Sequence, residues 1–180
     1  PVSPLKERVL EETEWQDSWK EHFHVLHVGK SLVISPTWRD YVPSSSDVLI
    51  SLDPGMAFGT GHHPTTRTCL EQLEDLIVPG MDVLDIGCGS GILSIASAKL
   101  GARSVLGVEI DSVAVGVARR NIRDNGIGQN VRIVQGSLPH PAVRALSHDI
   151  AVANISARVV SEIAGIIELA SLGGRKNLSA

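Results

Sequence analysis

The sequence predicts an α/β fold with a doubly wound, mainly parallel sheet that is incomplete at its carboxyl-terminal edge. Three observations predict this class. From Met81 onward, short apolar runs alternate with longer amphipathic stretches. Two of these stretches end just before a glycine, Gly101 or Gly126, where helices commonly end. A glycine-rich turn joins the first run to the first stretch. Strands and helices that alternate in this way need crossover connections, which give a parallel sheet covered on both faces.

The second part of the chain supplies the elements of this sheet. The short runs rich in Val, Ile and Leu predict buried strands, and the amphipathic stretches predict helices. The last element is the start of a further strand, in which Lys176 suits an edge position better than a central one. The expected order is strand 82–86, helix 91–100, strand 104–110, helix 112–125, strands 131–135 and 150–153, helix 157–172 and a strand within 173–180.

The first part of the chain has a different character. We expect a polar helix over residues 5–23, short strands at 25–28 and 31–35, and a loop through 43–46. This division predicts a linker or N-terminal extension over residues 1–46 and a ligand-binding domain over residues 47–180.

A strand at residues 48–52 leads into a glycine-dense loop that ends at Thr66. A helix is expected to follow, because Leu70 and Leu73 recur on one helical face. Thr68 and Glu71 have the spacing of a capping box, which predicts the start of this helix near Thr68.

Composition excludes several classes of protein. The 180 residues fit one domain of ordinary size, and no apolar stretch approaches the roughly 18 residues of a membrane span. The net charge of −4 argues against a general electrostatic grip on nucleic acid. Two cysteines and no secretory pattern favour a reducing compartment, so we expect a cytoplasmic protein. The first residue is Pro1 rather than Met, which leads us to expect a fragment of a longer chain.

The strongest motif is a glycine loop with an acidic residue before it and another after the next strand. Gly87, Gly89 and Gly91 lie between a predicted strand and a predicted helix, the context in which such glycines hold a nucleotide. Glu109 ends the next strand, close to the spacing of about 20 residues expected of a carboxylate that binds ribose. Asp85 precedes the first glycine by two positions.

Two cofactors use such a loop. A dinucleotide site has the pattern G-x-G-x-x-G, whereas this loop reads G-x-G-x-G. Asp85 beside the loop would repel a pyrophosphate but suits a cation, and S-adenosylmethionine carries a sulfonium and an ammonium group. The pattern therefore favours S-adenosylmethionine and a methyltransferase, with Asp85, Gly87, Gly89 and Gly91 at the cofactor. The alternatives are a dinucleotide site, or an Asp85 that only braces the turn.

Asn154 ends the strand at residues 150–153, at the edge of the sheet where the cofactor is expected. Its side-chain carbonyl could accept a hydrogen bond from an incoming amine and so position it for methylation. The alternative is an asparagine that only satisfies its own loop. Cys88 lies in the glycine loop near a helix N-terminus, a place that generally lowers a thiol pKa.

At these positions the sequence resembles the bacterial methyltransferases of ribosomal large-subunit protein eleven. The resemblance covers residues 15–174 and rests on the Pro36–Trp38 stretch, the loop at 52–66, the glycine motif at 83–93, and the segments 107–111 and 152–155. The family implies a class I fold, S-adenosylmethionine as cofactor, and methylation of lysine side chains and the N-terminal amine of that ribosomal protein. Relative to the family, the chain lacks the N-terminal recognition domain and the last strands.

The resemblance also implies roles for individual residues. The family's cofactor contacts fall on Thr66, Gly87, Glu109 and Asn154, and Glu109 stands where the family often has Asp. His63 is expected in the active site together with Asn154, and Phe58 in its wall. For both His63 and Phe58 a purely structural role is an equal alternative. Ser137 stands where related enzymes often place an acid for the adenine amine.

Other functions stay open at this point. The acceptor could instead be a nucleic acid or a small molecule, or the chain could be a non-catalytic cofactor-binding or interaction module. The exocyclic-amine methyltransferases of adenine typically place an aromatic residue after the strand-end asparagine, and this chain has Asn154-Ile-Ser-Ala. The histidines at 22, 24, 27, 62 and 63 lack an accompanying carboxylate or cysteine pattern, so no metal site is predicted.

Overall fold

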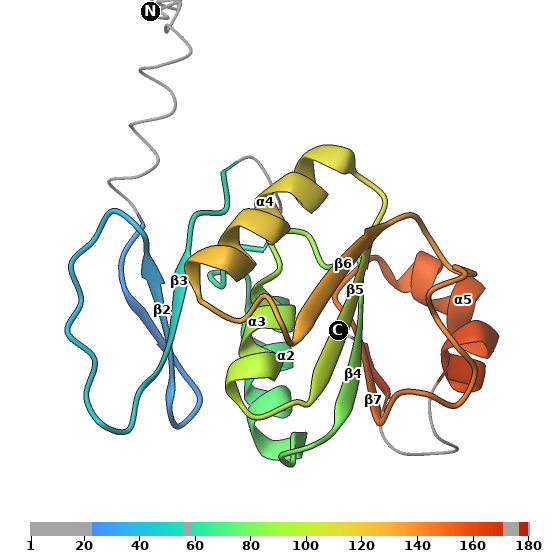
Figure 1. The fold of residues 1–180 in the computed structure, drawn as a ribbon, viewed down its shortest axis with the longest axis horizontal. Coiled ribbons are helices and arrows are strands. Elements are labelled where there is room, and N and C mark those ends of the chain that lie inside the picture. The colour runs from blue at the N-terminus through green and yellow to red at the C-terminus, as the bar shows by residue number, and fades with distance from the viewer. Residues whose placement is uncertain (1–22, 56–58, 171–176, 180) are drawn as a thin grey trace, which may run out of the picture.

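The structure is a computed structural model that describes residues 23–55, 59–170 and 177–179. The elements form layers (Figure 1): a small sheet, the helices α2 to α4, a larger sheet, and α5 on the far side. Phe58 and residues 1–22 lie outside the described part, and so does the predicted helix over residues 5–23 except for Phe23. Phe23 itself precedes the first strand as a loop residue.

The larger sheet is parallel throughout, as predicted. Its strands are β4 (Asp82–Ile86), β5 (Ser104–Glu109), β6 (Val131–Gln135), β7 (Ile150–Ala153) and β8 (Asn177–Ser179). Their order in space is β6-β5-β4-β7-β8. The chain begins in the middle at β4, runs to one edge and then returns to the other side, so the order reverses between β4 and β7. Ligands of doubly wound sheets bind at such a reversal, beyond the carboxyl ends of the strands.

The smaller sheet contains β1 (Leu26–Val28), β2 (Leu32–Pro36) and β3 (Val48–Leu52). β1 pairs with β2 in the antiparallel sense, and β2 pairs with β3 in parallel. The sequence predicts all three strands, but not that β3 belongs to the smaller sheet. The domain boundary expected after residue 46 falls between β2 and β3, which are direct neighbours, and it stays a prediction.

The helix α2 (Pro64–Leu76) begins earlier than expected. Pro64 occupies the first turn, where its fixed φ is favourable and its missing N–H is not needed. The His63 side chain caps this end by accepting from the Thr65 N–H. The predicted capping box of Thr68 and Glu71 is therefore wrong: Thr68 lies inside the helix, and its hydroxyl donates to the Pro64 carbonyl at 3.1 Å.

The other helices agree with the sequence pattern. They are α3 (Ile92–Lys99), α4 (Ser112–Asp124) and α5 (Ala157–Ala170). Gly101 and Gly126 follow α3 and α4 with positive φ angles, which confirms the predicted helix ends. The strand predicted within 173–180 is confirmed as β8, although Lys176 is outside the described residues.

Two apolar clusters hold the layers together. One fills the space between the smaller sheet, α2 to α4 and one face of the larger sheet, and the other lies between the opposite face and α5. The strand β4 contributes alternate residues to both clusters, Val83 to the first and Leu84 to the second, and both are fully buried. No helix in the described part of the chain is long and apolar enough to cross a membrane.

Candidate cofactor and acceptor site

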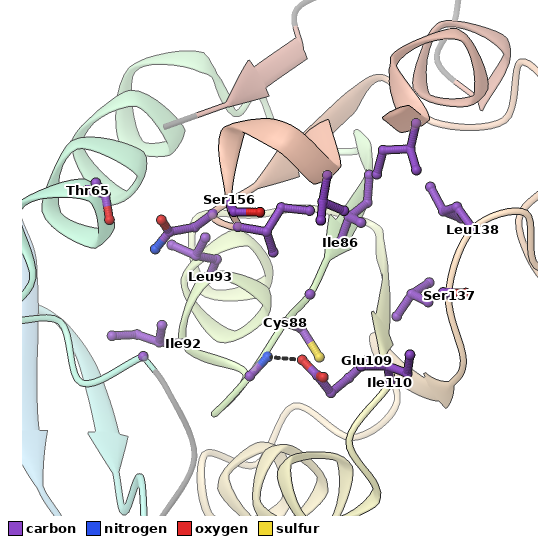
Figure 2. A pocket seen from close by; sticks show the side chains of 18 of the residues that line it. Thr65, Ile86, Cys88, Ile92, Leu93, Glu109, Ile110, Ser137, Leu138 and Ser156 are labelled. Atoms are coloured by element: carbon purple, nitrogen blue, oxygen red, sulfur yellow. Dashed lines mark hydrogen bonds between the residues drawn. The ribbon is translucent and has the colours of Figure 1, made fainter. Parts of the chain in front are cut away.

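A cavity of about 690 Å³ lies at the carboxyl ends of β4, β5 and β7. This is the position that the sheet topology predicts, and the volume is typical of a small-molecule site. Figure 2 shows Thr65 on one side of the cavity and Glu109 with Ile110 on the other. We call residues 87–91 with Glu109 the glycine-loop wall, and residues 59–66 the α2 wall.

The glycine-loop wall is arranged by backbone hydrogen bonds. The Gly87 N–H donates to the Val108 carbonyl at 2.8 Å, which ties the loop to the end of β5. The Glu109 carboxylate accepts from the Gly89 N–H at 2.8 Å, the dashed line in Figure 2. Its other oxygen accepts from the Asp111 N–H at 3.0 Å. Gly87, Gly89 and Glu109 therefore line the cavity together.

Gly91 does not line the cavity. It is the N-cap of α3, with φ of +84°, and it packs against Ala118 of α4. Gly91 therefore forms the turn by which the glycine loop enters α3.

Asp85 lies behind the glycine loop rather than in the cavity wall. It is 1% exposed, and one carboxylate oxygen accepts from the Ser94 hydroxyl at 2.6 Å. The other oxygen, Oδ1, has no hydrogen-bond partner among the described residues. Burial raises the pKa of this carboxyl to about 6, with a smaller contribution from nearby Glu109. Asp85 thus braces the first turn of α3, the alternative that the sequence left open, and still carries an unpaired buried oxygen.

On the opposite side, Asn154 follows β7 and lines the cavity. Its amide Nδ2 donates to the Thr66 hydroxyl at 2.9 Å. Thr66 itself is completely buried and does not line the cavity. The structure therefore brings Asn154 and Thr66 together, with Asn154 in front and Thr66 behind it.

His63 and Thr65 both line the cavity from the start of α2. The His63 Nδ1 lies 2.8 Å from the Thr65 hydroxyl, and it accepts from the Thr65 N–H. His63 is thus both the cap of α2 and a cavity residue. The sequence did not single out Thr65, because its hydroxyl could not be told apart from that of Thr66.

The cysteines are buried thiols. Burial is the largest cause that raises the pKa of Cys88, and burial also raises the pKa of Cys69 to about 11. A helix N-terminus generally lowers a thiol pKa, but at Cys88 desolvation dominates, and the carboxylates of Asp85 and Glu109 raise the pKa further. Neither thiol is prepared to act as a nucleophile.

The remaining lining is largely apolar. Sequence reasoning missed most of it, since an apolar residue after a strand looks like any core residue. Ser137 lines the cavity beside the apolar Leu138, in the place where an acid was considered. The apolar residues that line the cavity are Ile86, Ile92, Leu93, Val108, Ile110, Leu138, Ile155, Val159 and Ile163. Within the described residues, no three His, Cys, Asp or Glu side chains are grouped so that they could hold a metal ion.

The order of the strands and the place of this cavity define a Rossmann-like, doubly wound α/β fold. A solved RNA methyltransferase from Salinibacter ruber superimposes with a TM-score of 0.57 at 22% identity, covering 65% of this chain and 76% of that one, a likeness of fold alone.

The particular family is also shown. The model of the ribosomal protein L11 methyltransferase family (PrmA) matches residues 4–179, and the chain belongs to this family. The L11 methyltransferase of Chloroflexus aurantiacus is 50% identical over 82% of this chain and 44% of its own length. The crystal structure of the ribosomal protein L11 methylase from Lactobacillus delbrueckii is 35% identical, with a TM-score of 0.76 over 84% of this chain and 77% of that chain. The chain spans about half the length of the curated relatives it matches.

Proposed function

We infer that this chain binds S-adenosylmethionine and transfers its methyl group to amines of a ribosomal large-subunit protein, L11. The observation that carries this proposal is the arrangement of one cavity: a carboxylate, Glu109, fixed by two backbone N–H groups in the glycine-loop wall, and an amide, Asn154, facing the same cavity from β7. Membership of the L11 methyltransferase family supports the reaction and the acceptor.

The residues present fit the cofactor. A Cβ at Gly87 would lie 2.4 Å from the Ile155 side chain on a backbone with φ of +70°, so this turn of the cavity wall requires glycine. The unpaired Oδ1 of Asp85 places negative charge behind the loop, which suits a cationic ligand better than a pyrophosphate. Glu109 would accept hydrogen bonds from the ribose hydroxyls, and Ile110 with Leu138 would provide the apolar surface that an adenine ring needs. When bound, the cofactor supplies a methyl group activated by its sulfonium.

Asn154 would hold the acceptor. Because its Nδ2 already donates to Thr66, its Oδ1 is the atom left to face the cavity. When a neutral amine donates one N–H to Oδ1, the lone pair of its nitrogen stays free and can be directed toward the methyl group. This is catalysis by positioning, and it requires no strong base in the cavity. His63, also at the cavity, completes the proposed acceptor side.

The proposed acceptor is a protein amine, a lysine side chain or the N-terminal amine. Such an acceptor is made in the cytoplasm, where we place this protein. The chain's negative net charge agrees better with a basic protein acceptor than with direct binding to nucleic acid.

Calorimetry and methyl transfer test the proposal together. We expect the folded chain to bind S-adenosylmethionine and S-adenosylhomocysteine, and to transfer labelled methyl groups to purified ribosomal protein L11 and not to ribosomal RNA. Absence of cofactor binding by folded chain at millimolar ligand would overturn the cofactor assignment. Binding without transfer to L11 would reduce the chain to a cofactor-binding module, and label in RNA would replace the acceptor.

A further inference from the structure

Ser90 lies inside the glycine loop but is not among the residues that line the cavity. Its hydroxyl donates to the Gly59 carbonyl at 2.5 Å, and the residue is completely buried. Gly59 belongs to the α2 wall and lines the cavity, whereas Ser90 does not. Ser90 therefore connects the two walls directly.

Asn121, on α4, makes a second connection. Its Nδ2 donates to the Ser90 carbonyl at 2.9 Å, and its Oδ1 accepts from the Asp53 N–H at 3.0 Å. The side chain is completely buried and uses both ends of its amide. Ser90 and Asn121 thus attach the glycine loop to two residues, Asp53, which follows β3, and Gly59, which lies in the loop before α2.

The approach of the two walls is close at this point. Gly59 has a φ of +103°, and a Cβ placed on it would lie 2.8 Å from the Ser90 hydroxyl oxygen. Two residues further on, Gly61 packs with Ile34 and Ile92. The start of the α2 wall is therefore seated on the glycine loop and on the first residue of α3, and the Ser90 hydroxyl bonds to the Gly59 carbonyl there.

We propose that Ser90 and Asn121 are positioning residues that set where residues 59–65 stand relative to the cofactor loop, and thereby govern the acceptor side of the reaction separately from cofactor affinity. The proposal rests on the proposed function, because it assigns the α2 wall to the acceptor. It differs from a general stabilising role because Ser90 bonds directly to the α2 wall, while Asn121 holds Ser90 by its carbonyl and also bonds to Asp53 after β3.

The first test uses Ser90→Ala with Ser97→Ala as its matched control. Ser97 is also completely buried, but its hydroxyl donates to the Leu93 carbonyl within α3 and reaches no wall. We expect Ser90→Ala to lower kcat/KM for the acceptor by about tenfold or more, while the Kd of S-adenosylhomocysteine stays within about threefold. Ser97→Ala is expected to leave both within about twofold, and Ser90→Thr to recover transfer.

Asn121→Asp sharpens the result, because it keeps the acceptor for Asp53 and removes the donor to Ser90. It should reproduce the loss seen with Ser90→Ala. Weakening of S-adenosylhomocysteine binding by the same factor as transfer would overturn the proposal, since Ser90 would then act only on the cofactor loop. Equal losses in Ser90→Ala and Ser97→Ala would overturn it as well.

A readout without acceptor separates this proposal from the proposed function. Amide hydrogen exchange over residues 59–65 should be faster in Ser90→Ala than in wild type and in Ser97→Ala. Unchanged exchange there would overturn the positioning role even if the chain methylates L11. If exchange is faster in Ser90→Ala but the wild-type chain fails to methylate L11, the proposed function is overturned and the attachment of the wall by Ser90 stands.

Discussion

The two walls of the cavity are held in different ways. The glycine-loop wall is fixed mainly by backbone donors: Gly87 bonds to β5, and Gly89 with Asp111 orients Glu109, while one side chain, Asn121, donates to the Ser90 carbonyl. The α2 wall depends on side chains, namely Ser90 against Gly59, Asn154 against Thr66, and His63 as the cap of α2. The difference teaches that substitutions should damage the first wall through backbone shape or charge, and the second through the loss of single hydrogen bonds.

The largest effect is expected for Gly87→Ala. The new Cβ would meet Ile155 at 2.4 Å on a backbone with φ of +70°, so the loop has to move. Calorimetry should show S-adenosylhomocysteine binding weakened by at least about 100-fold. The control is Gly80→Ala, with a similar φ of +94° and no atom within 4 Å, which should keep wild-type affinity. Wild-type affinity in Gly87→Ala would contradict the shape argument.

Asp85→Asn tests the charge behind the same wall. Burial raises the folded-state pKa of Asp85 to about 6 from 3.8, so between these values the folded chain binds a proton that the unfolded chain has lost. The free energy of unfolding of wild type relative to the variant should fall by about 2–3 kcal/mol as pH rises from 4 to 7, and level off above that.

Urea unfolding at a series of pH values measures this difference. A stability difference between wild type and Asp85→Asn that stays constant from pH 4 to pH 7 would show that Asp85 keeps its ordinary pKa. Burial would then not disfavour the charge of Asp85 behind the glycine-loop wall.

Glu109→Gln is expected to weaken S-adenosylhomocysteine binding by about 10- to 50-fold. The amide keeps the shape of the side chain, but its NH₂ cannot accept a hydrogen bond, so either the Gly89 or the Asp111 N–H loses its acceptor, and the charge that favours ribose hydroxyls is lost. Glu109→Asp, which keeps the carboxylate, should bind more tightly than Glu109→Gln in the same titration. The reverse order would indicate that length matters more than charge at this position.

The smallest effect belongs to the α2 wall. Thr66→Val replaces the hydroxyl that accepts from Asn154 by a methyl group of similar size. Methyl transfer to L11 should therefore fall by about five- to tenfold. S-adenosylhomocysteine affinity should stay within about twofold, and Thr66→Ser should restore transfer. If Thr66→Val weakened cofactor binding as strongly as transfer, the two walls would not be separable.

Much of the architecture could be predicted from local pattern. The alternation of apolar runs and amphipathic stretches placed β4 to β7 and α3 to α5 within one or two residues, because burial on both faces of a parallel sheet leaves a clear pattern. The partner of a strand leaves no such pattern. β3 reads like any strand of the larger sheet, yet it pairs with β2 in another sheet.

The site divides in the same way. Gly87, Gly89, Glu109 and Asn154 could be placed at the cavity, because each follows or ends a predicted parallel strand; their roles there remain predictions. Burial could not be foreseen for Thr66, since it depends on packing against β7. Asn121 did leave a signal, because an asparagine on the otherwise apolar face of α4 needs a buried partner.

The hydrogen bond between Asn154 and Thr66 joins residues that are 88 positions apart, whereas the bond between Gly89 and Glu109 spans 20. Closing a longer loop costs more conformational entropy, so contacts of short separation tend to form first. During synthesis, every group of the glycine-loop wall has been made once Asp111 leaves the ribosome. The opposite side waits for β7. We therefore expect a nascent chain to acquire a place for the methyl donor before it acquires a place for the amine.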